Sequence, residues 1–519
     1  MTTSPEYHSY DEFKLRNEKL AEIREMGVEP YPHSYKPSHH TVDLAELKSG
    51  TFEEGEAGSS TEVSVAGRLV LFRAMGKNAF AQIQDESGRI QLMFNRDLTT
   101  VNGLNTDLIK PIKFIEKKID LGDIIGVKGH LFLTGKGELT IFVKELTLLC
   151  KTLLPLPDKH AGLADKGTRY RKRWLDLITH PEVVNTFKMR SQILRETRKY
   201  FDAMHFQEVE TPVMQNSYGG ASAKPFVSEL HALHQEMFMR IALELPLKKL
   251  MVGGLERVYE IGKVFRNEGL DKTHNPEFTM LEMYAAYWDY NDVMEATENL
   301  FAHLAKIIFG STKIGMRKSK DGVEHEIDLK APWKRMTMKA ATKEYGGYDV
   351  DKLSDEEMRA LLVDGSDYTA KEVREKSRGH LIAAMFEEFA EEKLIQPHHI
   401  TDHPIETTPL CKLHRDPKMA EERFVERFES FILGYEFCNA YTELNDPVLQ
   451  RELLEQQASK RDAGDEEATP LDEEFVEAIC QGMPPTGGLG IGIDRLVMLF
   501  SGAESIRDVL FFPIMRPEE

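Results

Sequence analysis

The stretch Leu255–Asp289 limits the possible folds more than any other, because it predicts a β-hairpin with a long polar connection. Two runs rich in β-branched and aromatic residues, 258–265 and 278–288, flank the polar segment Asn267–Pro276. Four residues of the second run share one parity: Phe278, Glu282, Tyr284 and Trp288. Side chains of one parity project from the same face of a strand, so this face combines aromatic rings with a carboxylate and a phenol. Such a face is typical of a pocket wall or of a buried polar network.

Charged side chains gather where this hairpin is expected to turn. Arg266 and Glu268 end the first strand, and Lys272, His274 and Asn275 follow in the loop. The cations among them are suited to holding phosphate groups. A short match such as the tetrapeptide FRNE is, in isolation, more typical of a surface hairpin with solvated charges.

The whole stretch, FRNEG followed by HNPEFTMLEMY, resembles motif 2 of the class II aminoacyl-tRNA synthetases and is most similar to the lysine-specific members. The resemblance implies that Arg266 binds the α-phosphate of ATP and that Phe278 stacks on the adenine ring. It also implies that Glu268 and His274 contact ATP.

Length, charge and cysteine usage narrow the class of protein. The 519 residues suffice for two or three domains, and the formal charge of -20 opposes non-specific binding to nucleic acid. Any tRNA contact must then depend on local basic patches and on shape. The four cysteines lie far apart without a CxxC pair, which argues against a zinc site or a disulfide framework. With no signal-peptide pattern and no apolar run long enough to span a membrane, we expect a cytoplasmic protein.

The N-terminal segment, residues 1–60, is predicted to hold a charged amphipathic helix and a connector. The helix is expected at Ser9–Met26, with Ser9 and Glu12 spaced as a capping box and Gly27 placed to end it. Four cations lie on this helix: Lys14, Arg16, Lys19 and Arg24. Charge alone favours a solvated helix face for them, and contact with tRNA is the functional alternative.

Residues 61–152 are predicted to form a small β-barrel. Five short strands with intervening turns are expected, at 63–72, 78–85, 88–94, 123–134 and 138–149. Five strands in this length indicate a Greek-key barrel of the OB type, and such barrels often bind single-stranded nucleic acid on exposed aromatic rings. Phe80 is a candidate for such a ring, although a ring on a strand is commonly a core residue.

The run Val65–Phe94 resembles the N-terminal anticodon-binding barrel of the lysyl, aspartyl and asparaginyl subgroup of these synthetases. In that subgroup a phenylalanine and a glutamine further along the chain read the central anticodon base. The resemblance implies this role for Phe80 and Gln91, and Arg73 matches a nearby contact.

A proline-marked linker, residues 153–180, leads to a second domain that spans 181–519. Its first part predicts a helix, Phe187–Met204, followed by a strand, Phe206–Met214. This pair resembles motif 1, through which class II synthetases dimerise, so the resemblance implies a homodimer. The family usually has glycine where this chain has His205.

Further segments resemble the parts of the family's pocket that bind the amino acid and Mg²⁺. The loop Ser217–Phe226 matches the mobile loop that closes over the amino acid. The implied lysine-binding residues are Gly220, Glu244, Glu282, Tyr284, Asn439 and Glu443. Glu429 and Glu436 match the carboxylates that bind Mg²⁺ and ATP. Asn439 and Glu443 share strand parity and Glu436 does not, so either a β-bulge intervenes or one of the three points away.

The segment Thr486–Phe500, TGGLGIGIDRLVMLF, resembles motif 3 of the same family. Glycines on a strand are followed by a helix whose first turn carries Arg495. A helix N-terminus and a guanidinium both favour a triphosphate, which supports the ATP-binding role that the resemblance implies for Arg495. The region around 310–400, between motifs 2 and 3, is predicted to be a helical insertion.

The strand pattern predicts a five-stranded OB-type β-barrel. The resemblance implies an α+β protein in which this barrel is followed by a class II catalytic domain with an antiparallel sheet flanked by helices. The resemblance implies a lysine–tRNA ligase that uses ATP and Mg²⁺ to convert L-lysine to lysyl-adenylate, releasing pyrophosphate. The lysine would then pass to the 3′ end of its tRNA with release of AMP. The implied catalytic residues are Arg266, Glu268 and Arg495.

Other functions stay open at this point. The carboxylates of the predicted pocket suit the ammonium of lysine, whereas an aspartate-specific site would need cations there. Lysine is therefore preferred, and an aspartyl- or asparaginyl-tRNA synthetase of the same subgroup is the closest alternative. A non-catalytic tRNA-binding paralogue is expected to lose residues of motif 2 or motif 3, and a lysyltransferase acting on protein is expected to lack the barrel. This chain retains the residues of motif 2 and motif 3, and it has the barrel.

Overall fold

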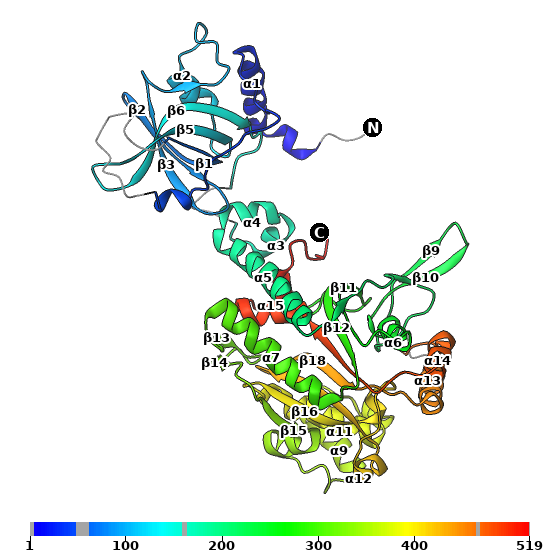
Figure 1. Cartoon of the computed structure of the whole chain (residues 1–519). Coiled ribbons are helices and arrows are strands. Elements are labelled where there is room, and N and C mark those ends of the chain that lie inside the picture. The colour runs from blue at the N-terminus through cyan, green and yellow to red at the C-terminus, as the bar shows by residue number, and fades with distance from the viewer. Residues whose placement is uncertain (1–4, 48–61, 158–162, 463–467, 518–519) are drawn as a thin grey trace. The chain divides into compact units, whose positions relative to one another are not determined.

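The computed structural model describes residues 5–47, 62–157, 163–462 and 468–517, and it divides into two compact units, Met1–Gly162 and Leu163–Glu519 (Figure 1). Parts of the predicted connector and linker, 48–60 and 158–162, lie outside the described residues. Each unit has its own hydrophobic core. Within the described ranges, no helix combines the length and apolar character that crossing a membrane requires.

The first unit is built around a sheet that closes into a barrel. In spatial order its strands are β3 (Arg89–Asn95), β2 (Asn78–Gln84), β1 (Glu62–Met75), β5 (Ile124–Leu133), β6 (Leu139–Cys150) and β4 (Thr100–Val101). β3 also pairs with β6, which closes the five long strands into a barrel. The predicted OB-type fold is confirmed, and the structure adds the short β4 and helix α2 (Pro111–Lys118) between β3 and β5.

Strand β2 shows how the sequence specifies this barrel. Ala79, Ala81 and Ile83 are buried in the barrel core, whereas the residues between them are half-buried on the outer surface. Burial with a period of two is expected of a strand that has one face against a core. Phe80 belongs to the outer set.

Helix α1 (Asp11–Glu25) lies where a helix was predicted, but its N-terminus is built differently. The predicted capping box of Ser9 and Glu12 is wrong, because Ser9 is taken up in the 3-10 turn η1 (Glu6–Ser9). Its Oγ donates to the first carbonyl of that turn at 2.7 Å. Glu12 instead pairs with Arg16, one turn along the helix.

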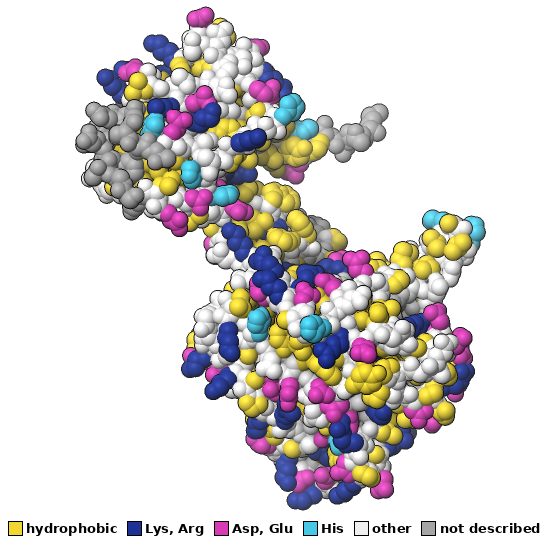
Figure 2. All heavy atoms as spheres, viewed as in Figure 1, with side chains coloured by type: hydrophobic (Ala, Val, Ile, Leu, Met, Phe, Trp, Pro, Cys, Tyr) yellow, Lys and Arg dark blue, Asp and Glu magenta, His cyan; other side chains and the backbone are white. Residues whose placement is uncertain are grey.

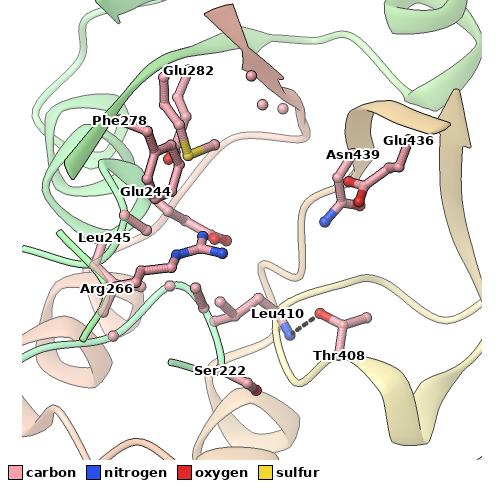
Figure 3. A pocket seen from close by; sticks show the side chains of 18 of the residues that line it. Ser222, Glu244, Leu245, Arg266, Phe278, Glu282, Thr408, Leu410, Glu436 and Asn439 are labelled. Atoms are coloured by element: carbon pink, nitrogen blue, oxygen red, sulfur yellow. Dashed lines mark hydrogen bonds between the residues drawn. The ribbon is translucent and has the colours of Figure 1, made fainter. Parts of the chain in front are cut away.

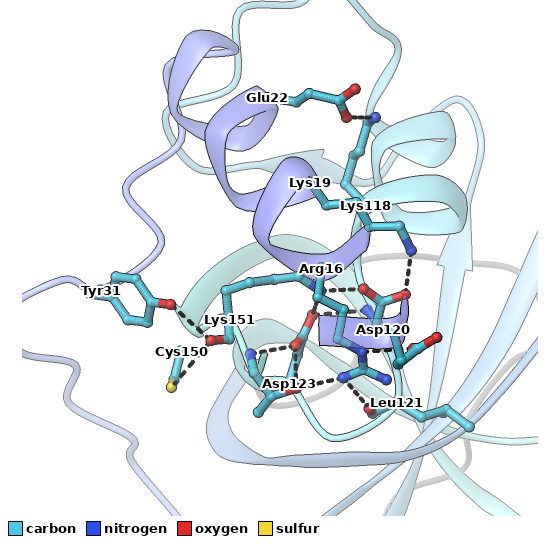
Figure 4. A network of polar contacts seen from close by, with 12 residues as sticks. Arg16, Lys19, Glu22, Tyr31, Lys118, Asp120, Leu121, Asp123, Cys150 and Lys151 are labelled. Atoms are coloured by element: carbon cyan, nitrogen blue, oxygen red, sulfur yellow. Dashed lines mark hydrogen bonds and ion pairs between the residues drawn. The ribbon is translucent and has the colours of Figure 1, made fainter. Parts of the chain in front are cut away.

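Ionic contacts hold α1 against the barrel (Figure 4). Lys19 Nζ lies 2.6 Å from Oδ1 of Asp120, a carboxylate that the buried Lys151 also contacts at 2.5 Å. Arg16 is buried and donates to the carbonyl of Leu121 at 3.1 Å. These two cations therefore pack the helix on the barrel, so the solvated face predicted as one alternative is wrong for them.

The second unit is organised around an eight-stranded sheet. In spatial order its strands are β15 (Lys334–Thr337), β16 (His398–Pro404), β17 (Phe424–Ile432), β18 (Tyr435–Thr442), β19 (Thr486–Gly492), β12 (Glu277–Ala286), β11 (Arg257–Phe265) and β7 (Gln207–Glu208). The pairs β15–β16 and β11–β7 are parallel, and the others are antiparallel. The predicted α+β class with a mainly antiparallel catalytic sheet is confirmed.

Helices flank this sheet. The helices α5 (Pro181–Ala203), α7 (Tyr290–Phe309) and α15 (Ile493–Ser501) pack with it in a large hydrophobic cluster that includes Phe201, Leu300 and Phe500 (Figure 1). The other helices of this unit are α3 (Lys166–Arg171), α4 (Arg173–Thr179), α6 (Glu244–Val252), α8 (Met338–Ala341), α9 (Asp355–Gly365), α10 (Ala370–Arg374), α11 (Arg378–Phe389), α12 (Pro417–Glu421), α13 (Pro447–Asp462), α14 (Glu473–Cys480) and α16 (Ile506–Val509). A small sheet consists of β8 (Met214–Gln215), β10 (Gln235–Met239) and β9 (Val227–Leu230).

The region around 310–400, predicted as a helical insertion, is mixed in structure. It contains helices α8 to α11, but also the hairpin of β13 (Lys313–Lys318) and β14 (Glu324–Asp328). Strand β15 of the same region pairs with β16 in the main sheet. The region is therefore continuous with the catalytic sheet.

Two local predictions in this unit are wrong. The strand expected at Phe206–Met214 is not continuous: only β7 and Met214, the first residue of β8, are in strands there. The preceding His205 has φ = 61°, the left-handed conformation that suits the glycine usual in the family. Trp288 does not share the face of Glu282, because β12 ends at Ala286. Its ring instead packs on Phe206, with centroids 5.9 Å apart.

Candidate active site

A cavity of about 440 Å³ in the second unit is lined by β12, β17, β18, β19, the start of α6 and neighbouring segments. It brings together every residue that the sequence assigned to catalysis, ATP, lysine or Mg²⁺: Gly220, Glu244, Arg266, Glu268, His274, Phe278, Glu282, Tyr284, Glu429, Glu436, Asn439, Glu443 and Arg495. In Figure 3, Arg266 extends from one wall toward Asn439 and Glu436 on the other.

The predicted hairpin is confirmed and forms one wall of the cavity. β11 and β12 pair in antiparallel register along their lengths. Because side chains alternate along a strand, Phe278, Met280, Glu282 and Tyr284 of β12 all face the cavity. The hairpin therefore carries an aromatic ring near its turn and a carboxylate and a phenol further from it.

A β-bulge in β18 resolves the parity conflict on the other wall. The pairing with β17 shifts at Phe437, which is left without a partner of its own. An extra residue of this kind reverses the parity of the chain beyond it. Glu436, Asn439 and Glu443 consequently all line the cavity, so the bulge is the correct one of the two predicted explanations.

The end of the cavity bounded by α6, β12 and β19 is acidic. Glu282 is buried there and accepts hydrogen bonds from the backbone N–H of Leu243 at 2.9 Å and from the hydroxyl of Tyr284 at 3.0 Å. Burial, together with the charge of Glu244, raises the pKa of Glu282 to about 7. A cation beside such a carboxyl favours its ionised form.

Glu443 is a second buried carboxylate at this end. Burial raises its pKa, the ion pair with Lys248 opposes the rise, and the charge of Glu244 adds to it. Its Oε1 has no hydrogen-bond partner among the described residues. Gly488 packs directly against that oxygen, since a Cβ at this position would lie 1.9 Å from it. Any larger residue would displace the carboxylate.

Lys248 was not predicted from the sequence. Its buried ammonium contacts both Glu244 and Glu443. Glu244 and Lys248 are spaced i, i+4 on α6, so a helical ion pair was the available signal. The second carboxylate is distant in the sequence, and no local pattern indicated it.

The opposite end of the cavity is cationic. The guanidinium carbon of Arg266 lies 5.2 Å from the ring centroid of Phe278, within the range of a cation–π contact. Arg495 donates to the carbonyl of Glu436 at 2.8 Å, and its Nη2 lies 3.2 Å from His274 Nε2. Two guanidinium groups and an imidazole around one space are suited to a polyphosphate.

Glu268 lies on the exposed rim beside this cationic end. Burial lowers the pKa of Arg266, and the attraction of Glu268 opposes that shift. The carboxylate therefore supports the charge of the arginine next to the polyphosphate space.

Two carboxylates on neighbouring strands form a candidate Mg²⁺ site. Glu429 lies on β17 and is held by Arg427 at 2.6 Å, and Glu436 lies on β18. Burial and the charge of Glu429 raise the pKa of Glu436, and Arg495 opposes the shift. Mg²⁺ is commonly bound by one or two carboxylates, with phosphates and water as its other ligands. The two carboxylates fit this pattern. The described ranges contain no group of three or more acidic, histidine or cysteine side chains placed to hold a metal.

The residues predicted to read the anticodon lie in the first unit, on its barrel. Arg73 is opposite Phe80 across β1 and β2, and Gln82 is opposite Gln91 across β2 and β3. Opposed residues point to the same side of a sheet, and Phe80 and Gln82 share one parity, so Arg73, Phe80 and Gln91 lie on one outer face. Phe80 is half-buried on that face, and the alternative that it is a core ring is wrong.

Each of the two units matches a known protein family. The family described as tRNA synthetases class II (D, K and N) matches residues 165–516, and the OB-fold nucleic acid binding domain of the tRNA anticodon family matches residues 63–149. The chain belongs to the class II aminoacyl-tRNA synthetases.

Curated relatives match this synthetase over nearly its full length. The lysine–tRNA ligase of Chlamydia pneumoniae is 56% identical over 99% of this chain and 98% of its own. The lysine–tRNA ligases of Bacillus cytotoxicus and Staphylococcus epidermidis are 47% and 46% identical, each over 98% of both chains.

The three segments that resemble class II motifs meet beside the cavity of this synthetase. Arg190 of α5, Thr279 of β12 and Asp494 of α15 are joined by hydrogen bonds and an ion pair. Sequence reasoning did not single out Arg190, because an arginine on a charged helix is usually solvated.

Proposed function

We propose that this synthetase is a lysine–tRNA ligase, which activates L-lysine with ATP and transfers it to the 3′ end of its tRNA. The relatives that match along almost the whole chain carry that name. The observation that carries the choice of amino acid is the acidic end of the cavity, where Glu244, Glu282 and Glu443 are all buried. Buried carboxylates are stabilised by a cationic ligand and repel an anionic one, so the site favours lysine over aspartate or asparagine.

The reaction proceeds in two steps that need no protein nucleophile. First, an oxygen of the lysine carboxylate attacks the α-phosphorus of ATP, the bond from that phosphorus to the bridging oxygen breaks, and pyrophosphate leaves. Next, a ribose hydroxyl at the 3′ end of the tRNA attacks the acyl carbon, and AMP leaves. Both steps depend on alignment and on neutralisation of the developing charge.

The cationic end of the cavity is suited to ATP. We assign Arg266 to the α-phosphate and Arg495 to the remaining phosphates, with His274 beside Arg495. Phe278 offers its ring to the adenine, and Glu268 supports the charge of Arg266.

The acidic end is suited to lysine. We assign the α-ammonium to Glu244, next to Gly220, where a Cβ would lie 3.0 Å from the Cβ of Glu244. The ε-ammonium then lies among Glu282, Glu443 and Tyr284. Asn439, on the facing wall, completes the lysine site.

Glu429 and Glu436 are the proposed protein ligands of Mg²⁺. When bound with ATP, the ion neutralises phosphate charge. The requirement is tested by titrating Mg²⁺ into the activation reaction after chelation, with Glu429→Gln as the variant that raises the Mg²⁺ concentration needed.

The barrel is the proposed anticodon-binding unit, with Arg73, Phe80 and Gln91 on its outer face. Figure 2 shows basic side chains interspersed with acidic ones over the visible face of each unit. Local cations are therefore present at the surface although the net charge is -20. Contact with tRNA then depends on such local groups and on stacking.

A homodimer and a cytoplasmic location complete the proposal. Near α5, Phe511 stacks on Phe187 with centroids 3.8 Å apart, and the adjacent Phe512 is 74% exposed. An exposed ring next to the motif 1 helix supports a subunit interface there.

All four cysteines are free thiols, as is usual in a reducing compartment.

Charging of tRNA tests the proposed function. Purified protein, ATP, Mg²⁺, unfractionated tRNA and labelled lysine are expected to give an alkali-labile lysyl ester on the tRNA. Labelled aspartate and asparagine are the controls. Charging with either of these and not with lysine would assign the chain to the other branches of its subgroup.

A further inference from the structure

One ammonium group joins the two carboxylates at the ends of the proposed lysine site. Lys248 Nζ donates to Glu244 Oε1 at 2.5 Å and forms an ion pair with Glu443 Oε2. The side chains of Lys248 and Glu443 are 0% exposed. Lys248 is absent from the lining of the cavity, so it holds both carboxylates from behind.

These contacts use one oxygen of each carboxylate. The hydroxyl of Tyr441 also donates to Glu244 Oε1, at 2.5 Å, while Glu244 Oε2 lies toward Gly220, 3.4 Å from where a Cβ would stand. On Glu443 the lysine takes Oε2, and the buried Oε1 has no hydrogen-bond partner within the described ranges. Apart from the contacts with Lys248 and Tyr441, one oxygen of each carboxylate has no hydrogen-bond partner among the described residues: Glu244 Oε2 and Glu443 Oε1, the latter buried against Gly488.

We propose that Lys248 is a positioning residue for the amino acid: it fixes one acceptor oxygen for the α-ammonium of lysine and one for the ε-ammonium. The inference rests on the proposed lysine-dependent activity and adds to it a residue that does not itself touch the substrate. A single acceptor oxygen suits a compact ammonium. A guanidinium, by contrast, is bound best by both oxygens of a carboxylate.

The charge of Lys248 also matters to Glu443. Among the residues that the structure describes, six titratable groups interact with Glu443: Lys248 and Glu244 of α6, Glu282 and Tyr284 of β12, Tyr441 of β18 and Cys411 of the adjoining loop. Of these six, Lys248 is the cation. Burial lowers its pKa, but the attraction of Glu244 and Glu443 outweighs burial and raises it, so the ammonium stays charged. Without this charge, a buried Glu443 is expected to take up a proton and to bind an ammonium poorly.

The matched variants are Lys248→Met and Lys249→Met. The first removes the charge and keeps an unbranched side chain that is one atom shorter. The second makes the same change at the next residue of α6, where the ammonium pairs at the surface with Glu474 at 2.9 Å. Lysine-dependent exchange between ATP and pyrophosphate reports on activation alone. In Lys248→Met we expect the KM for lysine to rise about tenfold or more near neutral pH, with the KM for ATP unchanged, and in Lys249→Met neither should change.

A pH profile separates this role from simple damage to the fold. In Lys248→Met, raising the pH ionises Glu443, so the KM for lysine relative to the parent should fall toward higher pH. Structural damage would raise both KM values or lower kcat at every pH.

The outcomes distinguish the inference from the proposed function. A parent that shows no exchange with lysine contradicts the proposed function. A parent that uses lysine, with a Lys248→Met variant that keeps the parent's KM for lysine at every pH, overturns the inference alone. If Lys248→Met does not fold, Lys248→Arg replaces it in the test. This variant keeps the charge, but its guanidinium binds both oxygens of a carboxylate. A raised KM for lysine with an unchanged KM for ATP supports the inference there too, and parent-like values overturn it.

Discussion

Arg190 Nη1 lies 2.6 Å from Asp494 Oδ1 and joins helix α5 to helix α15. The second oxygen of Asp494 accepts from the backbone N–H of Thr279 on β12 at 2.7 Å. Both charged side chains are largely shielded from water, with exposures of 13% and 3%. One ion pair therefore ties together the segments that resemble motifs 1, 2 and 3.

Removing this arginine should destabilise the fold. Arg190→Ala leaves a buried carboxylate without its partner, which costs roughly 3–5 kcal/mol. Arg198→Ala on the same helix removes an exposed pair with Glu208 and should cost less than about 1 kcal/mol. Denaturant unfolding followed by circular dichroism measures both. Equal, small losses would show that Asp494 is held by its other contacts.

Arg266→Ala should slow activation without unfolding the protein. Loss of one preorganised charge stabiliser raises the barrier by about 2.7–4 kcal/mol, which is measured as kcat/KM in lysine-dependent exchange. Lys263→Ala is the control, because this lysine lies on β11, which ends just before Arg266, is half exposed and pairs with Glu277 at 3.3 Å. Unchanged exchange in a folded Arg266→Ala variant would remove Arg266 from the reaction.

Glu282 should make stability depend on pH. Its pKa rises from 4.5 to about 7 on folding, so the folded protein keeps a proton that the unfolded chain has already released. The stability that this proton gives is fully present below 4.5 and is lost as the pH rises through about 7. Glutamine cannot ionise, so the Tm of Glu282→Gln relative to the parent should increase from about pH 5 to about pH 8. Thermal melts across this range measure the difference, and a constant difference would show that Glu282 does not titrate as described.

Phe80→Ala should separate charging from activation. The ring lies on the outer face of the barrel, and loss of one stacking platform costs roughly 1–3 kcal/mol of tRNA binding. The KM for tRNA should therefore rise, while exchange without tRNA keeps its parent rate. Phe132→Ala, which removes a half-buried ring from β5 of the same barrel, tests how far this face extends, because Phe132 is opposite Thr140, and Thr140 is opposite Gln91. If both variants charge tRNA as the parent does, the base is read elsewhere.

Patterns of local origin could be predicted from the sequence. Period-two alternation specified β2 of the barrel, and the spacing of Phe278, Glu282 and Tyr284 specified one wall of the cavity. Both follow from strand geometry alone. The end of β12 could not be predicted in the same way, because Trp288 continues the alternation in the sequence while its ring packs on Phe206, which is remote in the chain.

Features that depend on contacts between distant parts of the chain could not be predicted from the sequence. The bulge at Phe437 was one of two alternatives until the register with β17 decided it. Lys248 and Arg190 look like ordinary helix cations, and their roles come from Glu443 and Asp494, which other parts of the chain supply. Ser9 had the spacing of a capping residue. It lies instead in a 3-10 turn, and its hydroxyl donates a hydrogen bond within that turn.

We propose that the acidic end of the cavity selects lysine for activation by ATP. The most direct measurement is exchange between ATP and pyrophosphate, without tRNA, with each of the standard amino acids supplied in turn. We expect exchange that depends on lysine and on Mg²⁺, with aspartate and asparagine at the background rate. Robust exchange with aspartate or asparagine, and none with lysine, would contradict it.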